Sequence, residues 1–165
     1  MDAFFASIEA SSFSIWMRES PALYAFPGIL AVHTVGLALL AGLNVALDLR
    51  LLGVARPMPV TVFTRFVPVM WLGLWMNLFS GIALVAAYPT KALTNPVFYL
   101  KLGLIAAGLV MLRAMLRPLR AAQPQDTLAM KALAAASLVG WAATITAGRL
   151  LAYTCRRLMV DEMCS

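Results

Sequence analysis

The chain has 165 residues, of which 62% are hydrophobic and 12% are charged, and its formal net charge is +6. Soluble domains contain roughly 45 to 50% apolar residues, so this composition excludes an ordinary soluble enzyme. The 13 Lys and Arg residues are scattered between long apolar runs. This distribution is typical of charges that flank membrane spans and argues against nucleic acid as a partner.

The N-terminal segment, residues 1–22, is predicted to lie at the membrane interface. It carries Asp2 and Glu9 before any basic residue and lacks a continuous apolar core, so it does not fit a cleavable signal peptide. Over residues 11–18, aromatic and aliphatic side chains mix with serines and charge. This mixture predicts a short interfacial helix.

The rest of the chain, residues 23–165, is predicted to form one domain of four membrane-spanning helices. A span needs about 20 predominantly apolar residues, so four spans use roughly half of the chain and leave room for loops. The apolar runs cover residues 27–47, 67–88, 96–117 and 132–154. We therefore expect an all-α integral membrane four-helix bundle with a short N-terminal interfacial helix, and the lipid bilayer as its surroundings.

Prolines and charges mark the ends of these spans. Asp48 is predicted to close the first span, and Pro68 to lie in the first turn of the second, where its missing N–H costs least. The pair Asn95 and Pro96 is a helix-start signal for the third span. Pro118 is predicted to end that span.

Basic residues near the span ends predict the orientation of the chain. The loops between the first and second and the third and fourth spans hold seven of them, and the opposite side holds four. By the positive-inside rule, both termini then lie outside the cytoplasm, for a multi-pass protein of the bacterial inner membrane. The seven are Arg50, Arg56, Arg65, Arg113, Arg117, Arg120 and Lys131; the four are Arg18, Lys91, Arg156 and Arg157.

Three ionisable residues lie inside the spans, where charge is expensive and an ionisable side chain indicates function. They are His33, Lys101 and Arg149, on three different spans. Counted along its helix, each lies about 8 to 9 Å from the same membrane face. All seven Asp and Glu residues lie at or beyond span ends. We expect the three side chains to converge on one outward-facing pocket, with the negative charge supplied by a ligand, a lipid headgroup or another subunit.

His33 is the single histidine of the chain. A neutral imidazole among apolar residues can be an axial ligand of heme iron, and it can equally be a structural histidine with a hydrogen bond to a neighbour. The second span offers a small and polar stripe that includes Asn77 and Ser80. These two side chains are candidates for lining the pocket, although close helix packing is the commoner reason for such a stripe.

The fourth span carries small residues at every fourth position, from Ala132 to Gly148. This ridge permits tight helix contact and favours a homo-oligomer or a partner membrane subunit. It motivates one alternative function, a non-catalytic oligomeric membrane scaffold. The positive field of Lys101 and Arg149 motivates another, a transporter or channel for a small anion.

A family resemblance appears at these residues. The segments AVHTVGLALLAGLNVALDLRLLG, NPVFYLKLGLI and WAATITAGRLLAY resemble a bacterial family of four-span inner-membrane proteins without an assigned function. More distantly, a histidine in span one and a lysine early in span three resemble the four-helix membrane protoporphyrinogen oxidase and the copper-resistance D domain. That resemblance implies that His33 ligates heme and that Lys101 serves the porphyrin site.

The leading hypothesis is an integral membrane protein that binds heme b or a related porphyrin near the outer leaflet. His33 is the expected metal ligand, Lys101 and Arg149 neutralise the propionates, and Asn77 and Ser80 line the pocket. Its activity would be that of a cytochrome b-like electron carrier linked to an oxidoreductase, or of a porphyrin-handling protein. The sequence leaves open whether the chain is itself an enzyme.

Overall fold

The computed structural model describes residues 2–54, 56–121 and 127–157, and these residues form eight α-helices and no strand. Four of the helices are long and apolar: α3 (Phe26–Leu51), α5 (Val67–Ala87), α7 (Pro96–Arg120) and α8 (Leu128–Arg157). The shortest has 21 residues, so at about 1.5 Å per residue each can cross a hydrocarbon layer of about 30 Å. The predicted all-α, multi-pass membrane bundle is confirmed.

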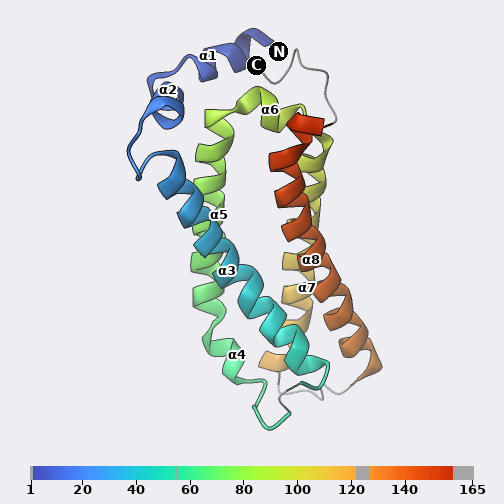
Figure 1. Ribbon diagram of the computed structural model, residues 1–165. Coiled ribbons are helices and arrows are strands. Elements are labelled where there is room, and N and C mark those ends of the chain that lie inside the picture. Colours follow the sequence, from blue (N-terminus) through green and yellow to red (C-terminus); the bar gives the residue numbers. More distant parts are fainter. Residues whose placement is uncertain (1, 55, 122–126, 158–165) are drawn as a thin grey trace.

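The four long helices form two pairs. Helix α3 packs along α5, and α7 packs along α8. Helix α3 runs obliquely across the molecule and also contacts α8, which joins the two pairs (Figure 1). One end of α3 therefore belongs to the α3–α5 pair, while its other end contributes to the junction with α8.

Two glycines allow α3 and α5 to approach closely. A Cβ atom on Gly36 would lie 2.9 Å from the carbonyl oxygen of Gly73, and a Cβ on Gly73 would lie 2.8 Å from the carbonyl oxygen of Gly36. Real Cβ atoms do not make such short contacts with backbone. The small residues therefore bring the two helices together by backbone packing, as in other membrane helix pairs.

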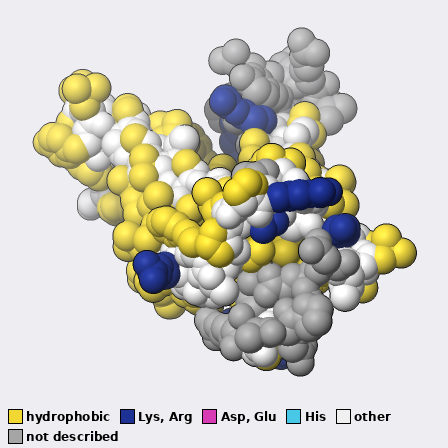
Figure 2. Space-filling view, turned by 90° about the horizontal axis from the view of Figure 1, so that it is seen from below, with side chains coloured by type: hydrophobic (Ala, Val, Ile, Leu, Met, Phe, Trp, Pro, Cys, Tyr) yellow, Lys and Arg dark blue, Asp and Glu magenta, His cyan; other side chains and the backbone are white. Residues whose placement is uncertain are grey.

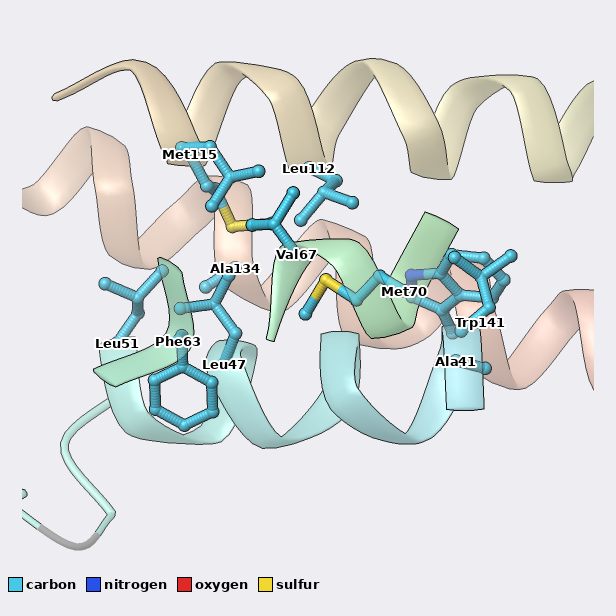
Figure 3. Packing of buried hydrophobic residues seen from close by; sticks show 12 residues of the cluster. Ala41, Leu47, Leu51, Phe63, Val67, Met70, Leu112, Met115, Ala134 and Trp141 are labelled. Carbon is cyan, nitrogen blue, oxygen red and sulfur yellow. The ribbon is translucent and has the colours of Figure 1, made fainter. Parts of the chain in front are cut away.

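The buried apolar core lies toward the end of the bundle that holds α4 (Val62–Arg65). Figure 3 shows Leu47, Leu51 and Phe63 close to Ala134 of α8 and Met115 of α7. Further along α8, the ring of Trp141 packs over Gly108 of α7, where a Cβ would lie 3.1 Å from the indole. This core ties α3 and α4 to α7 and α8.

The N-terminal segment forms two short helices, α1 (Asp2–Glu9) and α2 (Ser12–Glu19), instead of the single helix predicted over residues 11–18. Both lie at the end of the bundle that holds α6 (Pro89–Leu93) (Figure 1). Arg18 donates to the carbonyl oxygens of Ala87 and Glu9, so one guanidinium joins α1, α2 and the end of α5. The additional helix is α1. It is held by polar contacts such as this one, which the hydrophobic pattern of the sequence does not reveal.

Several span ends differ from the prediction. Helix α3 continues past Asp48 to Leu51, and α7 continues through Pro118 to Arg120. Pro118 lies in the last turn of α7, so the hydrogen bond that it removes and the crowding that it causes affect only the end of the helix. The start signals are confirmed: Pro68 lies in the first turn of α5, and the Asn95 side chain accepts a hydrogen bond from the Val97 N–H at 2.9 Å. Helix α8 is longer than predicted at both ends.

Figure 2 looks onto the end of the bundle where α3 connects to α5 and α7 connects to α8. Several Lys and Arg side chains are exposed on this end, and no acidic side chain is in view. The loops that the sequence count marks as basic therefore form one positively charged end of the molecule.

Candidate functional site

His33 is half-buried in the first part of α3, and its imidazole packs against α5. The Nδ1 atom lies 2.9 Å from the Oγ atom of Ser80. A Cβ atom on Gly81 would lie 3.4 Å from the ring atom Cε1. The edge of the imidazole therefore lies in contact range of this position of α5.

The contacts of Ser80 favour one tautomer of His33. The Ser80 hydroxyl lies within hydrogen-bond distance of the carbonyl oxygen of Met76, one turn earlier in α5, and of that of Asn77. When its single hydrogen is donated to one of these carbonyls, the hydroxyl oxygen accepts toward His33, and the matching tautomer carries its proton on Nδ1. Nε2 then keeps its lone pair. Histidines that ligate metals typically have this arrangement, with the second ring nitrogen held by a hydrogen-bond acceptor.

Asn77 acts on the backbone of His33. Its Nδ2 atom donates to the carbonyl oxygen of His33 at 3.0 Å, and it lies next to Gly36, where a Cβ would approach it to 2.8 Å. The amide thus fixes α3 against α5 at the level of the imidazole. In the structure Asn77 and Ser80 hold His33, and their polar atoms make these contacts within the bundle.

Lys101 lies on α7, half-buried against α8. Its Nζ atom would be 3.7 Å from a Cβ atom on Gly148, an ordinary contact distance, so the ammonium group lies beside this position of α8. Lys101 is close enough to His33 for an electrostatic interaction between them. This interaction agrees with the predicted common depth of the two residues, and their membership of one ligand site stays a prediction.

The Arg149 side chain does not lie inside the bundle with His33 and Lys101. It follows Gly148, so its backbone lies at the level of Lys101, but its side chain is exposed. Two of the three ionisable residues are therefore half-buried and within electrostatic range of each other, while the third lies on the surface. Arg149 follows Gly148 along α8, as predicted. Its side chain, however, faces the surface and not the predicted common pocket.

Part of the small-residue ridge of α8 packs against α7 of the same chain, whereas Ala132 and Ala136 are exposed. A Cβ atom on Gly140 would lie 3.4 Å from the Met111 methyl group, and Gly148 faces Lys101. Thr144 is buried and donates to the carbonyl oxygen of Gly140. These contacts involve Gly140, Thr144 and Gly148 and leave the exposed Ala132 and Ala136 unexplained, so the oligomer stays a prediction.

An apolar cavity of about 340 Å³ lies between α5 and α7. Its walls include Met70, Leu112 and, at its edge, Arg113, whose guanidinium lies 5.8 Å from the centre of the Trp71 ring. Neither His33 nor Lys101 lines this cavity. It is therefore separate from the candidate site.

A second polar group, which the sequence analysis missed, is buried between α3 and α8. It contains Asn44, Asp48 and Ser137, none of which has any exposed surface. The prediction that Asp48 closes the first span is wrong, because the carboxyl lies inside the bundle. The spacing of four between Asn44 and Asp48, on the same stripe as His33, was the available signal. Ser137 gave none, since it lies within an alanine-rich stretch.

The chain belongs to DUF6644, a family of unknown function whose model matches residues 4–154. The expected membership of a family without an assigned function is thereby confirmed. No curated protein matches the chain, and no solved structure matches it. The resemblance to the protoporphyrinogen oxidase and to the copper-resistance D domain stays a prediction.

Proposed function

We propose that this membrane protein binds heme b, or a closely related porphyrin, with Nε2 of His33 as an axial ligand. The observation that carries the proposal is the hydrogen-bond chain from Nδ1 of His33 through Ser80 to the Met76 carbonyl. This chain holds the neutral imidazole in the tautomer that ligates a metal through Nε2. It also fixes the ring against α5 before any ligand binds.

The residues around His33 favour a metal carried by a porphyrin over a bare metal ion. In the part of the chain that the structure describes, no group of three or more His, Cys, Asp or Glu residues converges on one point. A protein site for a bare transition metal commonly needs three or four such ligands. A porphyrin brings four nitrogen ligands of its own, so a single histidine is enough to hold it.

Lys101 supplies the charge that a porphyrin carboxylate needs. Its ammonium is half-buried beside Gly148 and near His33. Burial removes water from around this ammonium, and among the described residues no acidic side chain pairs with it. A propionate of the porphyrin would neutralise it. Arg149 is assigned a smaller role, since its exposed side chain meets solvent or headgroups at the same level.

In this proposal the chain is a b-type electron carrier or a porphyrin-handling protein of the bacterial inner membrane. The bound group would supply one-electron chemistry or itself be the cargo. Ser80 orients His33, and Asn77 fixes the backbone beneath it. The basic end in Figure 2 supports placing that end in the cytoplasm and the His33 site near the opposite face.

The test is the absorption spectrum of the full chain, expressed with ample heme supply and purified in detergent. We expect a Soret band in the parent protein and its loss in His33→Ala. The matched control is Thr34→Ala, which changes the exposed neighbour of His33 and should keep the band. A parent protein without a Soret band, or a band equally strong in His33→Ala, would overturn the proposal.

A further inference from the structure

The buried polar group on α3 and α8 is distinct from the His33 site. Asp48 follows His33 by 15 positions on the same helix, which corresponds to roughly 22 Å along the helix axis. Asn44 lies one turn before Asp48, and Ser137 reaches the carboxyl from α8. All three side chains are 0% exposed.

The unsatisfied atoms of these three side chains are all oxygens. Asn44 Oδ1, both carboxyl oxygens of Asp48 and Ser137 Oγ have no aligned hydrogen-bond partner. The Nδ2 atom of Asn44 donates to the Leu40 carbonyl oxygen at 3.1 Å, so the amide leaves its oxygen free. The Ser137 hydroxyl is near enough to donate to the carboxyl, although the pair does not reach the geometry of an aligned hydrogen bond. One hydroxyl hydrogen cannot satisfy both carboxyl oxygens and the amide oxygen, so buried acceptors are left over, and a bound cation is one way to satisfy them.

Among the residues that the structure describes, Ser137 is the side chain that acts on the Asp48 carboxyl, and no Lys or Arg does. The nearby positions of α3 and α8 that belong to the core are apolar, among them Leu47, Leu51 and Ala134. Arg50, two positions after Asp48, donates instead to the carbonyl oxygens of Met58 and Arg56. A buried carboxylate without a cationic partner is strongly unfavourable in this environment.

We propose that Asp48, Asn44 and Ser137 form a sodium-binding site inside the membrane bundle. Carboxylate, amide and hydroxyl oxygens are hard ligands, which suit a hard cation. One carboxylate balances one positive charge, whereas Ca²⁺ takes six to eight oxygen ligands and would leave an uncompensated charge. A proton bridges two oxygens, while a sodium ion can be shared by all the unsatisfied oxygens. Asp48 lies three residues from the end of α3, so the path from the basic end is short.

The experiment compares thermal unfolding of the detergent-purified full chain in NaCl and in choline chloride at equal ionic strength. With Na⁺ at about 100 times its Kd, the melting temperature of the parent protein should rise by roughly 5 to 10 °C. Asp48→Asn keeps the side-chain shape without the charge and should abolish the rise. The matched control Glu19→Gln removes an exposed carboxylate of α2 and should leave the rise unchanged.

Ser137→Ala provides a second test that does not depend on the Asp48 variant folding. It removes one ligand and should shift the midpoint of the sodium titration about tenfold toward higher concentration. Equal melting temperatures of the parent protein in the two salts would overturn the proposal. So would a sodium response that persists in Asp48→Asn, or stabilisation by acid with no effect of sodium, since a proton would then occupy the site.

Discussion

Ser80 controls His33 through the position of one hydrogen atom. Because the hydroxyl hydrogen points to Met76, the lone pairs of the oxygen remain for the imidazole N–H. In the proposed site, the availability of Nε2 of His33 thus depends on a residue that would not itself touch the ligand. The same reasoning explains why a serine suits this position of α5, whereas an alanine would leave the tautomer undetermined.

Replacing Ser80 with alanine should therefore weaken heme binding about 10- to 100-fold, the range seen when a partner of a metal ligand is removed. A hemin titration of the purified apoprotein measures the change. Thr34→Ala deletes a hydroxyl that bonds only within α3 and should leave the affinity unaltered. Equal affinities for Ser80→Ala and the parent would show that the hydroxyl does not position His33.

Lys101 is expected to lower the stability of the ligand-free protein while it raises the affinity for heme. Among the described residues no acidic side chain pairs with this half-buried ammonium, and such burial destabilises the ligand-free bundle. Lys101→Met keeps the length of the side chain, so we expect the apoprotein to gain about 0.5 to 2 kcal/mol of stability while its heme affinity falls. Denaturant unfolding and hemin titration measure the two effects. Lower stability of the methionine variant would contradict this account of Lys101.

The α3–α5 contact depends on two glycines at the scale of the helix pair. Gly73→Ala would place a Cβ atom 2.8 Å from the Gly36 carbonyl oxygen, so the helices must separate. We expect a loss of about 1 to 3 kcal/mol and weaker heme binding, because His33 and Ser80 lie on opposite sides of this contact. Denaturant unfolding monitored by circular dichroism measures the loss.

Gly42 provides the matched control on α3. No atom lies within 4 Å of a Cβ built at this position. Gly42→Ala should therefore be neutral or stabilise the helix by up to about 1 kcal/mol. If both glycine variants lose the same stability, helix propensity and not close packing governs this pair.

The sequence predicts the four long helices because each is an apolar run bounded by proline or charge. The sequence misplaces the helix ends, because polar side chains near an end can find hydrogen-bond partners elsewhere in the folded chain. Asp48 enters the core beside Ser137, and Arg50 reaches the carbonyl oxygens of the following loop. These partners come from other parts of the chain, so hydropathy along α3 alone could not reveal them.

The sequence predicted the level of the candidate site residues along their helices, but not the side of the helix on which each side chain lies. Counting residues from the span ends placed His33 and Lys101 at one level, and the electrostatic interaction between them agrees with that placement. Whether a side chain faces the interior depends on the rotation of its helix, which is set by contacts such as Gly148 with Lys101. For this reason Arg149 is exposed although its level was predicted.

The distribution of charge over the whole molecule predicts its orientation in the membrane. The basic end seen in Figure 2 should face the cytoplasm. A C-terminal alkaline phosphatase fusion, produced in a bacterium, should then be active, and a C-terminal GFP fusion should be dark. A fluorescent GFP fusion with an inactive phosphatase fusion would reverse the orientation and place the His33 site near the cytoplasmic face.

The identity of the iron ligand can be tested by chemical rescue. His33→Gly removes the imidazole and leaves its space beside Gly81, so added imidazole can take its place. We predict that the glycine variant, mixed with hemin in detergent, lacks the parent spectrum and regains it as imidazole is titrated. A variant that shows the parent spectrum without imidazole would contradict the assignment of His33 as the axial ligand.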